Sequence, residues 1–79
     1  QLLDGGVDAV ARKVAEEATE VVLAAKDDAA VASVAADRTG TREALAGELA
    51  DVLYHSLVLL AERGMTPAAV IDTLRERAG

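Results

Sequence analysis

The fold of this chain is decided by residues 13–20, which read Lys13-Val14-Ala15-Glu16-Glu17-Ala18-Thr19-Glu20. Alanine, lysine and glutamate favour helices, so the stretch predicts a helix. Glu17 and Glu20 are three residues apart, and residues at that spacing are neighbours on the surface of a helix. Downstream, Glu48 and Asp51 repeat the spacing in a second predicted helix. The sequence therefore predicts two helices that each carry an acidic stripe.

These two stripes predict a site for Mg²⁺. Each stripe lies at the margin of an apolar face, where we expect the two helices to pack. Carboxylates that converge at such an interface repel one another, and a divalent cation relieves the repulsion. Carboxylate oxygens are also the ligands that Mg²⁺ prefers. We expect Glu17, Glu20, Glu48 and Asp51 to hold the ion, in an enzyme that acts on a phosphorylated substrate. Spacing alone leaves open the alternative, two solvated acidic faces without a ligand.

Two further residues flank the acidic stripes. Lys13 lies one turn before Glu17, so its ammonium group can reach a phosphate bound at the metal. The alternative is an ordinary salt bridge from Lys13 to Glu17. His55 lies one turn after Asp51, and we expect it to form a structural hydrogen bond or to support a metal ligand rather than to catalyse.

The composition narrows the class of partner. The net charge is −6, and Tyr54 is the only aromatic residue. Nucleic-acid binding usually needs a basic face and often uses aromatic stacking, so the sequence argues against it. No apolar run reaches the roughly 18 residues needed to cross a bilayer, so we expect no membrane association. The absence of cysteine fits a reducing compartment, and we expect a cytoplasmic protein.

Hydrophobic residues make up 52% of the chain, which is a high fraction for a domain of only 79 residues. A domain this small buries a modest fraction of its own surface, so we expect a second copy to cover part of the remainder. We therefore predict a single all-α domain over residues 1–79, a small helical bundle completed as a homodimer. Because the sequence begins at Gln1 without an initiator methionine, we also expect a further segment before it.

Apolar residues at three- and four-residue steps predict helices over residues 7–26, 41–63 and 66–78. Between them, residues 27–40 are expected to form a short helix or an extended connection. The inward faces should be formed by Val7, Val10, Val14, Ala18, Val21 and Ala25 in the first helix, by Leu45, Leu49, Val52, Leu53, Ser56, Leu57 and Leu60 in the second, and by Val70, Ile71 and Leu74 in the third.

Glycine, threonine and proline residues predict where the three helices begin and end. The pair Gly5-Gly6 should break any helix before residue 7, with Leu2 and Leu3 packed on the core. Thr41 suits the N-cap of the second helix, and Gly64 suits the position just after its end. In the third helix, residues 66 and 67 (threonine, then proline) suit the N-cap and the first turn.

The two acidic motifs also resemble a known signature. Glu-Glu-x-x-Glu at residues 16–20 and Glu-x-x-Asp at residues 48–51 resemble the motifs of the all-α nucleoside triphosphate pyrophosphohydrolases, the MazG-like superfamily. Within it, residues 12–26 and 51–64, including Asp51-Val52-Leu53-Tyr54-His55, look like the phosphoribosyl-ATP pyrophosphatases. The resemblance covers most of residues 2–75.

This resemblance implies a dimeric helical bundle that cleaves phosphoribosyl-ATP with Mg²⁺ to phosphoribosyl-AMP and pyrophosphate, the second step of histidine biosynthesis. Position by position, Glu17, Glu20, Glu48 and Asp51 match the metal ligands. Glu16 matches a further acid that orients or deprotonates water, which makes Glu16, Glu17 and Lys13 the candidate catalytic residues. Lys13 also matches a lysine near the phosphates.

The sequence departs from the family pattern in two places. Alanine stands at position 15, where glycine is frequent, and the connection over residues 27–40 looks long. The resemblance also implies an N-terminal helix and a Ser-x-Thr-like segment before Leu2, which lie outside the given residues, so we expect part of the substrate site to lie outside them too. Two alternatives stay open: a house-cleaning pyrophosphohydrolase of the superfamily that acts on other nucleotides, and a non-catalytic helical dimerisation module.

Overall fold

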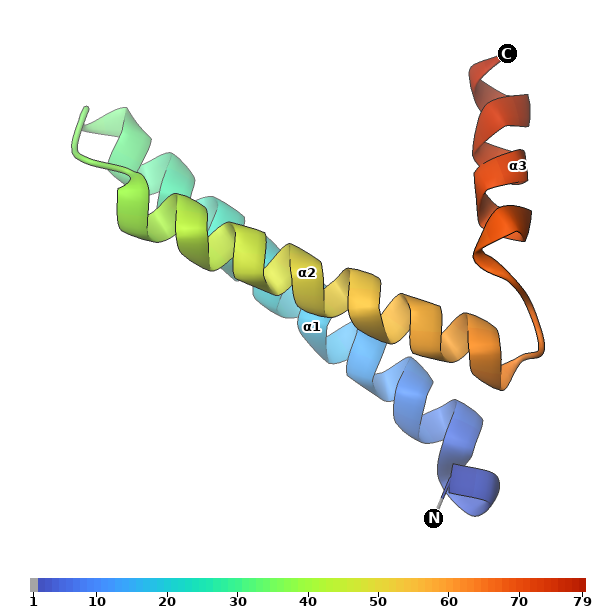
Figure 1. The fold of residues 1–79 in the computed structure, drawn as a ribbon. Coiled ribbons are helices and arrows are strands. Elements are labelled where there is room, and N and C mark those ends of the chain that lie inside the picture. Colours follow the sequence, from blue (N-terminus) through green and yellow to red (C-terminus); the bar gives the residue numbers. More distant parts are fainter. Residues whose placement is uncertain (1) are drawn as a thin grey trace.

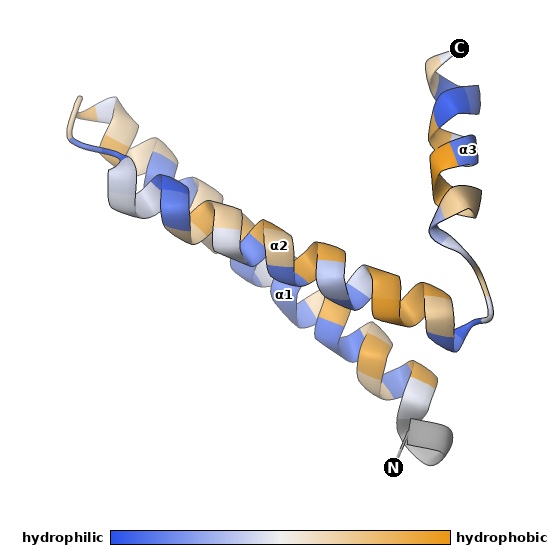
Figure 2. Ribbon diagram, in the orientation of Figure 1, coloured by the Kyte–Doolittle hydropathy of each residue, from blue (hydrophilic) through white to orange (hydrophobic). Residues whose placement is uncertain are grey.

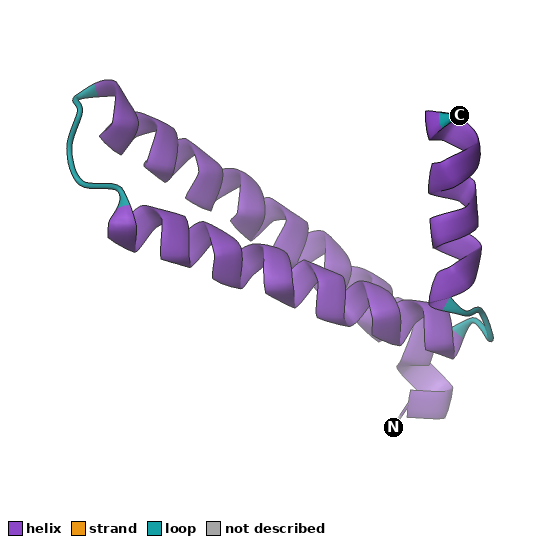
Figure 3. Ribbon diagram, turned by 45° about the horizontal axis from the view of Figure 1, so that its top comes forward, coloured by secondary structure: helices purple, strands orange, loops and turns teal. Residues whose placement is uncertain are grey.

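The computed structural model describes residues 2–79, with their side chains from residue 6 onward. Over these residues the chain forms three helices and no strand (Figure 3). α1 spans Leu2–Ser33, α2 spans Thr39–Glu62 and α3 spans Pro67–Ala78. The predicted all-α class is confirmed. The prediction that Leu2 and Leu3 pack on the core concerns side chains outside the described residues.

α1 and α2 form a long antiparallel hairpin, and α3 turns away from its open end (Figure 1). The described chain measures 46 × 38 × 14 Å, with a radius of gyration of 15.8 Å. A compact domain of this length has a radius of gyration of about 12 Å. A single chain is therefore a flat, open arrangement of helices, and not a closed bundle.

The prediction that Gly5-Gly6 prevents a helix from forming before residue 7 is wrong, because α1 runs through both residues. Glycine within a helix costs about 1 kcal/mol relative to alanine, so it weakens a helix without forbidding it. Gly6 is buried near the end of α2. A Cβ atom there would lie 3.0 Å from Oε2 of Glu62, the far end of a side chain that can turn away.

Both long helices end in the same backbone motif. At the end of α2, the amides of Gly64 and Met65 donate to the carbonyls of Ala61 and Leu60, and Gly64 has a φ of 71°. This is a Schellman motif with glycine in the left-handed position, which confirms the predicted role of Gly64. α1 ends in the same pattern with Ala35 in the left-handed position, at a φ of 56°.

The middle of the chain differs from the prediction at both boundaries. α1 continues to Ser33 and α2 begins at Thr39, so about two thirds of the ambiguous stretch 27–40 is helix and only residues 34–38 connect the two helices. α2 begins at Thr39 and has Arg38 in the N-cap position, so Thr41 is not its cap. Thr66 and Pro67 do precede and open α3 as predicted, although the Thr66 side chain makes no capping hydrogen bond.

α1 contacts α2 through a face that includes polar residues. The less exposed residues recur at three- and four-residue steps. In α1 they are Val10, Val14, Glu17, Val21, Ala24, Asp28 and Val31, and in α2 they include Thr41, Leu45, Glu48, Val52 and His55. We call this contact the seam. It passes through the acidic margin that the sequence predicted.

The predicted inward face of α2 is consequently only partly correct. Leu49, Leu53 and Leu57 point away from α1 and are 46%, 66% and 47% exposed. In α3, the predicted inward residues Val70, Ile71 and Leu74 are also exposed, because α3 stands apart from the hairpin. One hairpin buries a single stripe of each helix, so the second apolar stripe of α2 stays uncovered. Figure 2 shows this apolar character in the second half of α2 and along α3.

By length and composition alone, α2 is apolar enough to cross a membrane. The core helix of a soluble protein passes the same test when it is mostly buried, but none of this apolar window of α2 is buried in one chain. Glu48 and His55 lie within this helix and contact α1 across the seam.

Candidate functional site

Glu17 is the buried centre of the seam. Its side chain is 8% exposed, and its Oε1 lies 2.7 Å from Nδ1 of His55 in α2. The same ring nitrogen lies 3.2 Å from the backbone carbonyl oxygen of Asp51. With a proton on Nδ1, the imidazole donates to the carboxylate and fixes its orientation. The structure thus brings together Glu17 and His55, two residues that the sequence singled out, from two different helices.

Glu48 lies within electrostatic range of the other three predicted metal ligands. Hydrogen bonding to the Glu20 carboxyl group, burial, and repulsion from Glu20, Asp51 and Glu17 together raise the pKa of Glu48 above its usual range. Each of the other three predicted ligands therefore acts on this one carboxyl group. The arrangement concentrates negative charge between α1 and α2, and hard divalent cations bind such oxygen-rich sites.

The side chains do not form a finished metal site. Among the described residues, no group of three acids or histidines stands close enough to hold a metal ion. Like charges favour side-chain rotamers that separate the carboxylates, and a cation favours rotamers that bring them together. The donor set, with four carboxylates on facing helices, fits a divalent metal by its chemistry.

Lys13 and Glu16 lie beside this acidic region at the solvent edge of α1. The Nζ atom of Lys13 is 3.9 Å from Oε1 of Glu16, and the two side chains are 50% and 57% exposed. Lys13 therefore approaches Glu16 rather than Glu17, the partner considered from the sequence. An ion pair this long and exposed contributes little stability, so both groups are free to meet a ligand.

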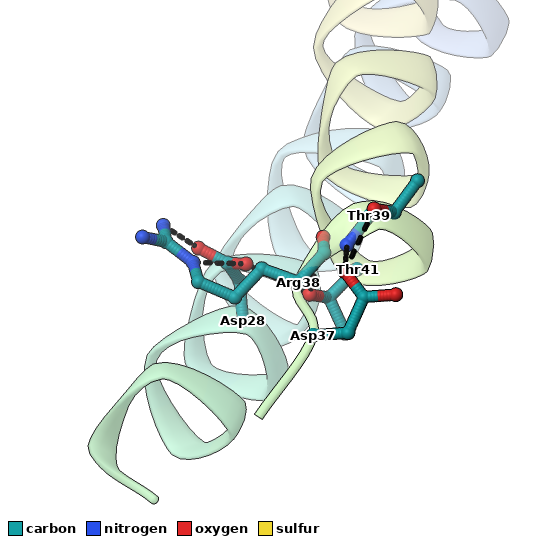
Figure 4. A network of polar contacts seen from close by, with 5 residues as sticks. All are labelled: Asp28, Asp37, Arg38, Thr39 and Thr41. Carbon is teal, nitrogen blue, oxygen red and sulfur yellow. Dashed lines mark hydrogen bonds and ion pairs between the residues drawn. The ribbon is translucent and has the colours of Figure 1, made fainter. Parts of the chain in front are cut away.

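The sequence did not predict the polar cluster at the tip of the hairpin (Figure 4). Arg38 donates to both carboxylate oxygens of Asp28, with Nε–Oδ1 and Nη2–Oδ2 distances of 3.0 and 2.5 Å. The Thr41 hydroxyl group donates to the same carboxylate at 2.8 Å. The hydrogen bonds from Arg38 and Thr41 lower the pKa of Asp28 to about 2. Spacing gave no signal for this cluster, because its members meet only when the chain reverses direction.

At the start of α2, a hydrogen bond to Asp37 takes the place of the predicted capping by Thr41. Asp37 accepts hydrogen bonds from the backbone amide of Thr39 at 3.1 Å and from its hydroxyl group at 2.8 Å. These bonds lower the pKa of Asp37. The side chain thereby satisfies one of the free amides that open α2.

A cavity of about 290 Å³ lies between the acidic region and the tip. Its lining residues come from both helices, and they are Glu20, Leu23, Ala24, Asp27, Gly40, Thr41, Ala44 and Glu48. Glu20 and Glu48 thus belong both to the predicted metal ligands and to the cavity wall. The sequence did not single out the other lining residues for a function.

The sequence pattern of the phosphoribosyl-ATP pyrophosphohydrolases matches residues 1–78. The chain belongs to this family. It is 44% identical over all 79 residues to the phosphoribosyl-ATP pyrophosphatase of Variovorax paradoxus, of which it covers 56%. It is 46% identical over the same length to the phosphoribosyl-ATP pyrophosphatase of Burkholderia cenocepacia, of which it covers 59%. The chain thus spans less than two thirds of the length of these relatives. No solved structure matches it.

Membership of the phosphoribosyl-ATP pyrophosphohydrolase family confirms the resemblance drawn from residues 16–20 and 48–51. In this member of the family, the two motifs lie on α1 and α2, with Glu17 and Glu48 on the seam and Glu16, Glu20 and Asp51 exposed. The four carboxylates of these motifs are oxygen ligands of the kind that divalent metals prefer.

Proposed function

We propose that the full-length protein hydrolyses phosphoribosyl-ATP to phosphoribosyl-AMP and pyrophosphate, the second step of histidine biosynthesis, in the cytoplasm. Water adds across the phosphoanhydride between the α and β phosphates. The observation that carries the proposal is that, in a chain of this family, the two acidic motifs lie on the contacting helices α1 and α2, with Glu17 8% exposed at their contact.

In this proposal Mg²⁺ is held by Glu17, Glu20, Glu48 and Asp51. When bound, the ion supplies positive charge that stabilises the oxygens of the departing pyrophosphate. His55 holds the Glu17 carboxylate in one orientation through the contact at 2.7 Å. It acts as a positioning residue and does not touch the substrate.

Two exposed residues of α1, Lys13 and Glu16, bind the substrate phosphate and activate the attacking water in this proposal. Lys13 binds a phosphate oxygen of the substrate, and Glu16 orients the attacking water and accepts its proton. Their loose pairing at 3.9 Å leaves both groups able to turn towards a ligand. Most of the acceleration then comes from placing the water and stabilising charge on the leaving group.

A second copy of the chain completes the fold in this proposal. Leu53, Leu57, Val70, Ile71 and Leu74 are all more than 40% exposed in one chain. With Ser56, Leu60 and Pro67 they line an apolar groove of about 310 Å³ between α2 and α3. Covering this groove with the same surface of a partner buries apolar area without uncovering the seam.

Pyrophosphate release by the full-length protein with Mg²⁺ tests the activity, with phosphoribosyl-ATP and a panel of ordinary nucleoside triphosphates as substrates. We expect release from phosphoribosyl-ATP alone, reduced at least about 100-fold by Asp51→Asn because a metal ligand is lost. Asp72→Asn, on the exposed face of α3, is the matched control and should keep the activity. Release from the panel but not from phosphoribosyl-ATP would assign the protein to nucleotide house-cleaning. A folded protein inactive on every substrate would support the non-catalytic module.

A further inference from the structure

One aromatic side chain stands exposed beside the acidic residues of the seam. Tyr54 is 62% exposed, although an aromatic ring gains more from burial than most side chains do. Its ring packs edge to face with the ring of His55, with 4.9 Å between the centroids and 82° between the planes. His55 in turn contacts Glu17 at 2.7 Å. A ligand on the open face of the Tyr54 ring would therefore lie next to the predicted metal ligands.

Tyr54 lies outside the surface that a second copy is proposed to cover. Among the described residues, those that line the apolar groove between α2 and α3 include Leu53 and Leu57 but not Tyr54. Tyr54 comes three residues after Asp51, so the two are neighbours on the surface of α2. The open face of the ring thus belongs to the acidic side of the hairpin.

Gly47 leaves room beside this ring. It lies seven residues before Tyr54 on nearly the same side of α2, and the side chain of a helical residue leans towards the preceding turn. A Cβ atom at Gly47 would meet nothing within 4 Å, so no contact among the described residues explains a glycine in the middle of this helix. The ring and the glycine together offer space for a flat ligand.

The substrate of the proposed function contains a flat group whose charge suits this ring. In phosphoribosyl-ATP the second ribose is attached to N1 of adenine, and a substituent at N1 makes the adenine ring a stronger base. This ring therefore carries positive charge at neutral pH, whereas the adenine ring of ATP is neutral. A cation over the face of a tyrosine is attracted by its π electrons, and nucleobases also stack on aromatic faces.

We propose that Tyr54 binds the positively charged adenine ring of phosphoribosyl-ATP on its open face, over Gly47, and so favours this substrate over ATP. This inference rests on the proposed function and adds a determinant of specificity to it. The adenine ring is the middle of the substrate, so phosphate groups extend from it in both directions, and the triphosphate reaches the metal ligands beside Asp51. The acids of the two motifs contribute nothing to the preference once a metal ion neutralises them.

Three substitutions separate the ring face from the fold. Tyr54→Phe keeps the aromatic face, and Tyr54→Leu removes it at an exposed position where leucine is a better helix former than tyrosine. Gly47→Leu keeps the ring and fills the space beside it. Val34→Ala is the control, because Val34 is an exposed apolar residue at the hairpin tip.

The first measurement compares two nucleosides without phosphate, 1-methyladenosine and adenosine, on the full-length protein with Mg²⁺ at pH 7. The ring of 1-methyladenosine carries the same charge as that of the substrate. We expect it to shift the backbone NMR signals of residues 47–55 and to bind at least about threefold more tightly than adenosine. Tyr54→Leu and Gly47→Leu should weaken this binding at least about fivefold, whereas Tyr54→Phe and Val34→Ala should keep it within about twofold.

The same titration contains the results that would overturn the proposal. These are shifts that are absent or fall elsewhere on the chain, equal binding of the two nucleosides, and equal losses in Tyr54→Phe and Tyr54→Leu. A Tyr54→Leu protein that binds 1-methyladenosine normally but sediments as a monomer would make Tyr54 a contact between two copies, and it would overturn the proposal as well.

The second measurement follows the reaction itself. Tyr54→Leu should raise KM for phosphoribosyl-ATP at least about fivefold, and it should leave kcat and inhibition by inorganic pyrophosphate within about twofold of the wild type. An unchanged KM would contradict the role of Tyr54. A wild-type protein that binds 1-methyladenosine at Tyr54 but does not hydrolyse phosphoribosyl-ATP would count against the proposed function and not against the site for the charged ring.

Discussion

At the scale of single residues, the seam contains acids where a helical hairpin would ordinarily place apolar side chains. Glu17 is 8% exposed and contacts His55, and Glu48 has a raised pKa because of the carboxylates around it. A raised pKa means that the folded chain holds the proton of Glu48 more tightly than the unfolded chain does. Ionisation of this residue at neutral pH therefore costs stability when no cation is bound.

Glu48→Gln should consequently stabilise the metal-free protein and inactivate it. The cost of ionisation is absent below the ordinary pKa of 4.5 and grows as the pH rises above it. We expect the melting temperature of the variant at pH 7 to exceed that of the wild type by a few degrees, with no difference at pH 4. Added Mg²⁺ should raise the melting temperature of the wild type only.

Glu43→Gln is the control for this comparison, because Glu43 is an exposed acid of the same helix outside the seam. It should leave melting temperature and activity unchanged. A metal-free Glu48→Gln protein that melts below the wild type at pH 7 would contradict the electrostatic account of the site.

At the scale of the elements, the hairpin is closed at its tip by Asp28, Arg38 and Thr41. The Asp28 carboxylate belongs to α1 and its two partners lie at the start of α2, so these bonds fix the relative position of the helices. The cavity wall is built from the same two segments. Thr41 therefore belongs both to the tip cluster and to the cavity wall.

The tip cluster predicts a specific pH dependence of stability. The Asp28 pKa falls from 3.8 to about 2 on folding, so its stabilising contribution is complete above about pH 4 and is lost as the pH falls towards 2. Asp28→Asn should be less stable than the wild type in urea at pH 7, and the two midpoints should converge over that acidic range. Asp8 is an exposed acid of α1, and the urea midpoint of Asp8→Asn should stay close to that of the wild type at every pH. If the midpoints of Asp28→Asn and the wild type differ by the same amount at every pH, the charge of Asp28 is not the cause of the lost stability.

At the scale of the whole molecule, one chain exposes more surface than a compact protein of its mass. Its accessible surface is 5837 Å², whereas about 4,500 Å² is typical of a compact monomer of 8.1 kDa. The surplus of about 1,300 Å² exceeds the area that each partner buries in an interface of standard size, about 800 Å². The apolar groove between α2 and α3 is the part of this surface that a second copy would cover.

Leu53→Lys should separate the proposed dimer into monomers, because it places a charge in the apolar groove. Leu53 is 66% exposed in one chain and lines that groove. Analytical ultracentrifugation of the full-length protein should give a dimer for the wild type and a monomer of lower thermal stability for the variant.

Val34→Lys is the control for the dimer, since Val34 is 72% exposed at the hairpin tip, outside the groove. It should remain a dimer. A monomeric wild type, or a Leu53→Lys variant that stays dimeric, would contradict the groove as the dimer contact.

The sequence by itself determined the helical class, the two acidic motifs and the family, because all three depend on spacing along the chain. It also determined the turn at Gly64, where a left-handed residue needs a local signal. Only the tertiary structure decided which stripe of α2 faces α1, since its apolar and acidic stripes are adjacent and both follow the helical period. The same holds for Gly6, the Asp28–Arg38 bonds and the cavity, because each depends on how two helices approach after the chain reverses direction.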